Sequence, residues 1–232
     1  MINVVCLKWG SKYSADYVNK LYSSILRNTS LSIKFHCFTE DRAGLNSNIT
    51  VHSLPYSNIE SWWNKLYLFS DKIDIPVGET IFYIDLDTLV TSNIDDLLNV
   101  SVEKIVVLRD FLKGLAATAG DMGSGLMAWK HGEYTDVWTR FISDPASAIK
   151  QVEPHGDQHW IDLCIKDRNY WQDLYPNRVV SFKVHCLSGL PKAASIVCYH
   201  GRPSIPESVT YRGKLWKFDI TPQPWVLDYW RE

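Results

Sequence analysis

Thr80-Ile81-Phe82-Tyr83-Ile84, followed at once by Asp85-Leu86-Asp87, is the stretch that decides the fold class. Its β-branched and aromatic residues predict a strand buried on both faces, as in a largely parallel sheet covered by helices. Ligands of open α/β sheets bind at the edge where such strands end. Residues i and i+2 of a strand point to the same side, so Asp85 and Asp87 can reach one cation. A D-x-D sequence also arises by chance, and the two residues could instead only end the strand and cap a turn.

The size and composition of the chain fit one domain with a substantial core. It has 232 residues, of which 46% are hydrophobic, and a net charge of −2. No run of Lys or Arg marks a face for nucleic acid or an anionic membrane. The N-terminus lacks the features of a signal peptide and no apolar run is long enough to span a membrane, so we expect a soluble, cytoplasmic protein. Five cysteines without C-x-x-C spacing predict buried, reduced thiols.

Strands and helices are expected to alternate along the chain. Strands are predicted over residues 2–7, 33–39, 49–52, 81–85, 104–108, 123–129 and 196–199, and helices over 14–27, 61–69, 133–142 and 157–165. The alternation predicts a doubly wound, largely parallel sheet that becomes mixed in its second half. In the helix over 61–69, Trp62, Leu66 and Phe69 are expected to share the buried face. The proline-rich and tryptophan-rich tail after Gly201 is expected to wrap the surface.

Several motifs follow one another in a definite order. They are Trp63-Asn64-Lys65-Leu66, Phe82 to Val90 with Asn93 to Leu97 after it, Gly156-Asp157-Gln158, and His200-Gly201-Arg202-Pro203. Together they resemble the GT-A glycosyltransferases, especially the group of glycogenin and the lipopolysaccharide galactosyltransferases with its small bacterial or viral relatives. The resemblance covers roughly residues 1–206. It implies a Rossmann-like, mixed but mainly parallel sheet flanked by helices, in one domain over 1–232 with a nucleotide-binding half to about residue 110 and an acceptor half with a tail from about 111.

The resemblance implies a bound cation and a nucleotide-sugar. Asp85, Asp87 and His200 would hold Mn²⁺ or Mg²⁺, with Asp87 as the firmest ligand and Asp85 shared with the ribose. The nucleotide part of a UDP-sugar would contact Leu7, Lys8, Trp9, Tyr13, Lys65, Asp85, Leu86, Gly201 and Arg202.

For three of these assignments, an ordinary structural role could explain the residue in place of ligand binding. Trp9 and Tyr13 could pack the first helix onto the sheet instead of holding the base. Lys65 could be solvated on an amphipathic helix. A lone histidine after a strand, such as His200, is more often packed or on the surface, although the adjacent Gly201-Arg202 favours a phosphate site.

Asp157 is the expected catalytic residue. A helix N-terminus keeps its carboxylate ionised, which would also suit a simple capping residue. It could be the base that deprotonates the acceptor hydroxyl in an inverting reaction, or a nucleophile or stabiliser in a retaining one. The sequence leaves both mechanisms open. The residues expected to contact the donor sugar are Asp110, Ser124, Gly125 and Gln158, although Asp110 could be an ordinary loop residue.

Two motifs depart from the pattern of the resembling group. Where that group has Asn-Ser-Gly, this chain has Gly123-Ser124-Gly125, so an amide contact to the donor sugar is missing. The glycine at the head of this segment also suggests a close backbone approach. The lysine after the C-terminal histidine loop is replaced around Ser204, which leaves Arg202 as the nearest cation. Directly before the first of these motifs, the segment Phe111 to Met122 is expected to be a lid that orders over the donor.

The expected function is metal-dependent transfer of a sugar from a UDP-sugar to a glycan or other hydroxyl acceptor. A sugar nucleotidyltransferase is one alternative, but it should carry a glycine-rich, basic phosphate loop after the first strand, where this chain has Lys8-Trp9-Gly10-Ser11-Lys12. A carbohydrate- or nucleotide-binding module without turnover is the other. Metal-dependent hydrolysis of the nucleotide-sugar would separate the transferase from the module.

Overall fold

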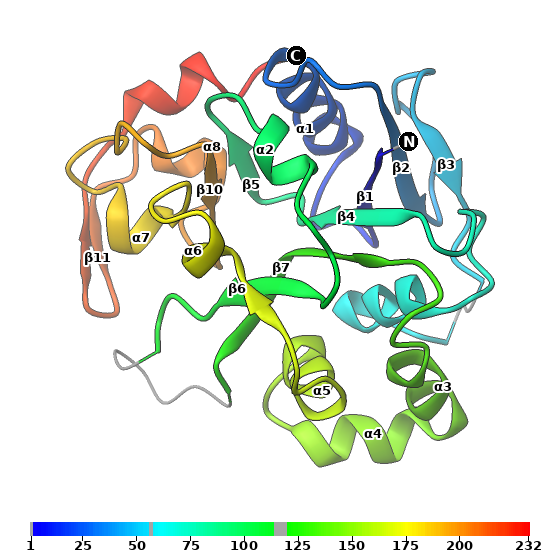
Figure 1. Cartoon of the computed structure of the whole chain (residues 1–232). Helices are drawn as coiled ribbons and strands as arrows, with labels where there is room; N and C mark the ends of the chain where they lie inside the picture. The colour runs from blue at the N-terminus through cyan, green and yellow to red at the C-terminus, as the bar shows by residue number, and fades with distance from the viewer. Residues whose placement is uncertain (1, 56–57, 114–119) are drawn as a thin grey trace.

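The computed structural model describes residues 2–55, 58–113 and 120–232, and within them the centre is a seven-stranded mixed sheet (Figure 1). Its strands, in spatial order, are β3 (Thr50–His52), β2 (Ile33–Thr39), β1 (Ile2–Lys8), β4 (Thr80–Ile84), β7 (Met122–Lys130), β6 (Val106–Arg109) and β8 (Asn169–Tyr170). β7 runs antiparallel to β4 and β6, and the other neighbouring pairs are parallel. The expected mixed, mainly parallel sheet is confirmed.

Helices cover both faces of this sheet. They are α1 (Ala15–Arg27), α2 (Asp95–Leu98), the 3₁₀ helix η1 (Ser61–Phe69), α3 (Asp136–Ser143), α4 (Pro145–Val152) and α5 (Asp157–Cys164). α1 and α2 lie on one side, and η1 with α3 to α5 on the other (Figure 1). Strand β4 feeds both cores, because Phe82 and Ile84 pack on the α1 side while Ile81 and Tyr83 pack on the η1 side. This is the two-residue alternation of a strand buried on both faces.

The segment over 61–69 is a 3₁₀ helix, and this corrects the expected buried face. With three residues per turn, positions i, i+3 and i+6 align. Accordingly Trp63, Leu66 and Phe69 lie in the core, with 8%, 0% and 0% of their surfaces exposed. Trp62, which a period of 3.6 places with Leu66 and Phe69, is instead 54% exposed.

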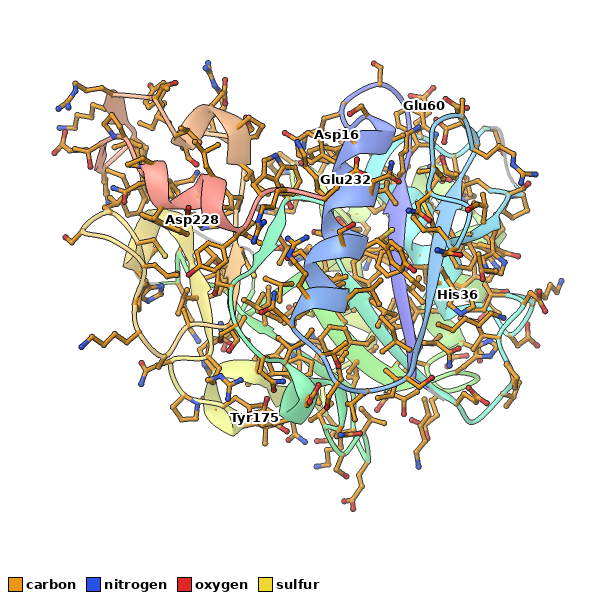
Figure 2. All side chains as sticks on the ribbon, turned by 90° about the horizontal axis from the view of Figure 1, so that it is seen from above. Asp16, His36, Glu60, Tyr175, Asp228 and Glu232 are labelled. Atoms are coloured by element: carbon orange, nitrogen blue, oxygen red, sulfur yellow. The ribbon has the colours of Figure 1, made fainter. Side chains whose placement is uncertain are left out.

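The C-terminal part folds onto the side of the central sheet. A three-stranded sheet of β5 (Thr88–Val90), β10 (Ile196–Cys198) and β9 (Val179–Ser181) leads into it. The remaining elements are α6 (Trp171–Leu174), α7 (Phe182–His185), α8 (Ile205–Ser208), the β11 (Gly213–Leu215) and β12 (Phe218–Ile220) hairpin, and the 3₁₀ helix η2 (Pro224–Asp228). Tyr175, which follows α6, donates from its hydroxyl to the carbonyl oxygen of Asp96 at 3.0 Å and lies beside α2 in Figure 2.

The tail, which was expected to wrap the surface, also contributes buried residues to the core. It builds a third apolar cluster with Val226 and Trp230, and the Trp230 ring packs on Tyr17 of α1 at 4.9 Å between centroids. Arg27 donates to the carbonyl oxygen of Tyr229 at 3.0 Å. The C-terminal Glu232 therefore ends beside α1 (Figure 2).

The cysteine expectation agrees with the structure. All five cysteines are free thiols, and all but the half-buried Cys164 are buried. Across the part of the chain that the structure describes, no helix combines the length and the apolar character needed to cross a bilayer.

The buried His36 and the half-buried His52 lie side by side at the edge of the sheet. His36 on β2 is 0% exposed, and its Nδ1 lies 2.8 Å from His52 Nε2 on β3. Its Nε2 lies 3.2 Å from Asn3 Oδ1. Burial, with the nearby charges of His52 and Lys34, lowers the pKa of His36 to about 4, against a smaller opposing effect of Asp74. The pKa of His52 is lowered as well, mainly by burial.

We expect the free energy of unfolding to fall as the pH drops from 6.5 toward 4. In this window the unfolded state takes up a proton at His36 that the folded state refuses, so folding is penalised by about 1.4 kcal/mol per pH unit, or about 3 kcal/mol in all. Urea denaturation at pH 7, 6 and 5 measures the slope, and His36→Gln should flatten it. An equal slope in the variant would contradict this account.

Candidate active site

One pocket of about 730 Å³ opens at the ends of β1 and β4. Most of the residues singled out in the sequence line it: Leu7, Trp9, Tyr13, Lys65, Asp85, Leu86, Asp87, Asp110, Ser124, Gly125, Asp157, Gln158 and His200. They come from segments spread over almost the whole chain. The sheet edge therefore collects side chains that the sequence separates by up to 193 positions, from Leu7 to His200.

The acidic pair lies in a turn and not on the strand. β4 ends at Ile84, and β5 begins at Thr88, so strand alternation does not orient Asp85 and Asp87. The turn is fixed from both sides, because the amide of Asp85 donates to the Gly125 carbonyl and the amide of Tyr199 donates to the Asp87 carbonyl, each at 2.9 Å. Both acidic residues line the pocket as expected, but for this different reason.

Gly125 leaves room for the Asp85 carboxylate. A Cβ atom at this position would lie 3.1 Å from Asp85 Oδ2. The close backbone approach expected at the glycine-led strand is therefore made to the chain's own acidic residue. A side chain at position 125 would therefore require the carboxylate to shift by a few tenths of an ångström.

The buried ammonium of Lys65 lies between the carboxylates of Asp85, an expected metal ligand, and Asp157, the expected catalytic residue. Lys65 Nζ lies 3.2 Å from Asp85 Oδ1 and 3.0 Å from Asp157 Oδ2. It also donates to Ser124 Oγ at 3.1 Å, and Ser124 Oγ in turn donates to Asp157 Oδ2 at 2.8 Å. Tyr83 completes the group by donating from its hydroxyl to Asp85. Lys65 is thus buried and not solvated, and it lines the pocket with its ammonium held by two carboxylates.

Charge balance explains why Lys65 stays protonated. Burial alone would lower its pKa, but the carboxylates of Asp157 and Asp85 more than offset burial, and the pKa is raised above its ordinary value. The ammonium is 7% exposed and Asp157 is 10% exposed, so little solvent screens the pair. Lys65 thereby fixes Asp85 and Asp157 relative to one another.

The Asp87 carboxylate lies beside Tyr13, at the edge of the group formed by Lys65, Asp85 and Asp157. Its Oδ2 accepts a hydrogen bond of 2.9 Å from the Tyr13 hydroxyl. Burial and the neighbouring Asp85 charge nevertheless raise the pKa of Asp87 to about 6. Tyr13 also packs on the Tyr17 ring, with centroids 4.9 Å apart, so part of its surface is occupied by packing.

His200 lies on another wall of the pocket. Its Nε2 is 2.6 Å from Ser181 Oγ, and its ring stacks on Phe111 at 6.2 Å and 12°. Burial, together with the charges of Lys183 and His185, lowers the pKa of His200 to about 4, so the imidazole is neutral at pH 7. A neutral imidazole is the form that binds metals.

The three expected metal ligands do not converge in the observed arrangement. Within residues 2–55, 58–113 and 120–232, no three His, Cys, Asp or Glu side chains form a group that could hold a metal ion. Asp85 and Asp87 both line the pocket, but the His200 ring is engaged by Ser181.

Three of the expected nucleotide contacts lie outside the pocket lining. Lys8 is buried, with its ammonium 4.0 Å from Asp41 Oδ2. Arg202 is exposed and pairs with Glu207 at 2.9 Å. Gly201, beside it, is exposed with a φ of +75°. Their assignment to the nucleotide stays a prediction.

Other lining residues were not singled out for the site. They include Lys12, Trp62, Tyr83, Arg109, Phe111 and His155. Phe111 directly follows Asp110, and His155 precedes Asp157 by two positions. Their closeness in sequence to expected site residues was the only signal that could have indicated them. No pattern in the sequence distinguishes Trp62 from core tryptophans. The expected lid falls partly on residues 114–119, outside the described part of the chain.

Neither a family model nor a curated protein matches the chain. Solved structures do. The glycosyltransferase GlyE from Streptococcus pneumoniae TIGR4 has a TM-score of 0.64 at 15% identity, over 88% of this chain, and the chain spans 56% of GlyE. The galactosyltransferase LgtC, in complex with donor and acceptor sugar analogs, has a TM-score of 0.63 at 13% identity, over 88% of both chains. The bifunctional glycosyltransferase WbbM has a TM-score of 0.55 at 12% identity, over 98% of this chain and 50% of its own.

At these identities the likeness concerns the fold. It includes the mixed central sheet and nearly the whole of this chain. The fold expected from the motifs is therefore confirmed: the protein has the GT-A fold found in glycosyltransferases.

Proposed function

We propose that the protein transfers a sugar from a UDP-sugar to a hydroxyl group of a glycan or other acceptor, with Mn²⁺ or Mg²⁺ at the diphosphate. The observation that carries this proposal is the grouping of Asp85, Asp87, Lys65 and Asp157 in one pocket at the strand ends of a GT-A fold. Acidic and basic groups of this kind match a substrate that has a diphosphate at one end and a sugar at the other.

The pocket fits a divalent cation at the two carboxylates. Asp85 and Asp87 supply hard oxygen ligands, and burial, followed by the charge of Asp85, raises the pKa of Asp87. The Nε2 atom of His200 would be free to join them after it leaves Ser181. When bound, the cation would stabilise the negative charge on the departing UDP.

The chain's own residues would place the substrate. Leu7, Trp9 and Tyr13 form the wall beside β1 and α1, where we place the uracil base and ribose. The donor sugar would then lie near Ser124, Gly125 and the start of α5. Binding there requires the Lys65 network to stay intact, because it sets the position of Asp157.

Asp157 is suited to act on the sugar or on the acceptor. One of its oxygens is held by Lys65 and Ser124, and it is the first residue of α5, where free backbone amides favour an anion. A carboxylate fixed in this way could serve as the general base or as the group that stabilises the developing positive charge of the donor sugar.

Titration of UDP into the purified protein, with and without Mn²⁺, tests the proposal. We expect UDP to bind more tightly with Mn²⁺, and Asp87→Ala to weaken Mn²⁺-dependent binding at least about tenfold, because a charged metal ligand is lost. Asp167→Ala is the matched control, since Asp167 pairs with Lys104 on the surface. Absence of UDP binding by the wild-type protein under both conditions would refute the donor assignment.

A further inference from the structure

Trp62 is a large apolar side chain in an unusual position. It is 54% exposed, yet it lines the pocket. The 3₁₀ geometry of η1 turns Trp63 into the core and Trp62 toward the pocket. A single exposed tryptophan is unremarkable on a protein surface, but this one lies at the solvent-facing edge of the candidate active site.

The backbone holds the indole in this position from two sides. Ser61, the residue before it, has a φ of +57°, in the left-handed region that few non-glycine residues adopt. Across from it, a Cβ atom at Gly156 would lie 2.7 Å from Trp62 Nε1 and 3.1 Å from Cδ1. The indole can therefore lie directly against the backbone of the segment that leads into α5.

Polar residues of η1 and of the segment leading into α5 line the pocket together with Trp62. Ser61, His155 and Gln158 line the same pocket. His155 and Gln158 flank the Gly156-Asp157 step, so the indole lies against the residue that directly precedes the expected catalytic carboxylate. An aromatic face beside hydroxyl, imidazole and amide groups matches a pyranose ring, which has an apolar C–H face and a rim of hydroxyls.

The position of Trp62 favours the acceptor over the donor. The base and ribose were placed on the wall of Leu7 and Tyr13, whereas Trp62 belongs to the wall formed by η1 and α5. The donor sugar needs the buried groups Lys65 and Ser124, which are 5% and 4% exposed. The indole, at 54% exposed, is open to solvent and so is accessible to a second substrate.

We infer that Trp62, with His155 and Gln158, forms an acceptor subsite in which the indole stacks on a pyranose ring of a carbohydrate acceptor. This inference rests on the proposed transferase function, and it specifies a sugar, rather than a protein or lipid hydroxyl, as the group beside Asp157.

Saturation-transfer NMR on the intact protein with UDP and Mn²⁺ tests this subsite. The probes are methyl β-D-galactopyranoside, methyl β-D-glucopyranoside and methyl α-D-mannopyranoside. We expect ring C–H protons of at least one of them to receive saturation, and Trp62→Ala to weaken its affinity about tenfold, whereas Trp62→Phe retains most of it.

Two further variants separate stacking from general damage. Gly156→Ala keeps the indole but displaces it, and the φ of −100° at this position suits alanine, so it should weaken sugar binding as Trp62→Ala does. Trp216→Ala removes an equally exposed tryptophan, 51% exposed on the strand connection β11–β12, and should leave sugar binding unchanged.

The outcomes are distinguishable from those of the proposed function. No saturation of any of the three sugars by the wild-type protein, or equal affinity in Trp62→Ala, would overturn the acceptor subsite. If Trp62→Ala binds a UDP-sugar more weakly but keeps its affinity for the free methyl pyranosides, the indole belongs to the donor site, and the acceptor subsite is overturned as well. Failure of UDP to bind would refute the donor site, whatever the sugars do.

Discussion

Lys65→Met should lower the free energy of unfolding by about 3–5 kcal/mol, because removing one partner of a buried charge pair leaves the other charges without compensation. Lys65 is 5% exposed and contacts Asp85 and Asp157 at 3.2 Å and 3.0 Å. The methionine keeps the length and the apolar stem but leaves two neighbouring carboxylates beside an apolar group. For a chain of this size the loss corresponds to a decrease in Tm of roughly 10 °C.

Chemical denaturation of matched variants measures this effect. Lys104→Met is the control, because Lys104 pairs with Asp167 on the surface, where both side chains are largely exposed, and such pairs contribute at most about 1 kcal/mol. Lys65→Met combined with Asp157→Asn should recover part of the lost stability, since one of the uncompensated charges is then gone. Equal stability of Lys65→Met and the wild-type protein would contradict the role of this ammonium.

The fold could be predicted from local patterns because they agree with one another. The apolar stretch before Asp85 predicts a buried strand, and β4 is indeed the strand between β1 and β7 in the sheet. The glycine-led segment predicts a close approach, which Gly125 makes to Asp85. In each case the pattern is formed by residues that are adjacent in the chain, so it can be recognised without knowing the fold.

Trp62 shows where periodicity fails. A period of 3.6 and a period of 3 diverge by about 20° per residue, so over the length of η1 they exchange Trp62 and Trp63 between pocket and core. Two adjacent tryptophans satisfy either period. The choice depends on packing against Phe141, whose ring stacks on Trp63 at 5.5 Å, and this contact joins segments far apart in the chain.

The Lys65 network could not be predicted for a related reason. The sequence indicates an amphipathic segment with a lysine, two acidic motifs and a serine, but their meeting point depends on how η1, β4, β7 and α5 pack. Burial of the ammonium follows only when the carboxylates are placed within about 3 Å. The same holds for His200, whose partner Ser181 comes from a strand that the sequence did not indicate.

Asp157→Asn should lower turnover of a UDP-sugar by about 100-fold to 10,000-fold, the usual contribution of a positioned carboxylate to acid–base chemistry. The amide keeps the shape of the side chain, and its oxygen can still accept hydrogen bonds from Lys65 and Ser124, so the pocket geometry is preserved. What is lost is the negative charge. The effect is expected whether Asp157 acts as a base or stabilises the donor sugar.

The most direct test of the transferase assignment is UDP release from UDP-glucose, UDP-galactose and UDP-N-acetylglucosamine in the presence of Mn²⁺. Wild-type protein, Asp157→Asn and the surface control Asp167→Asn are compared. The account predicts release from at least one donor by the wild-type protein and the control, abolition by EDTA, and the large loss in Asp157→Asn. No release by the wild-type protein from any of the three donors, or equal rates in Asp157→Asn, would contradict it.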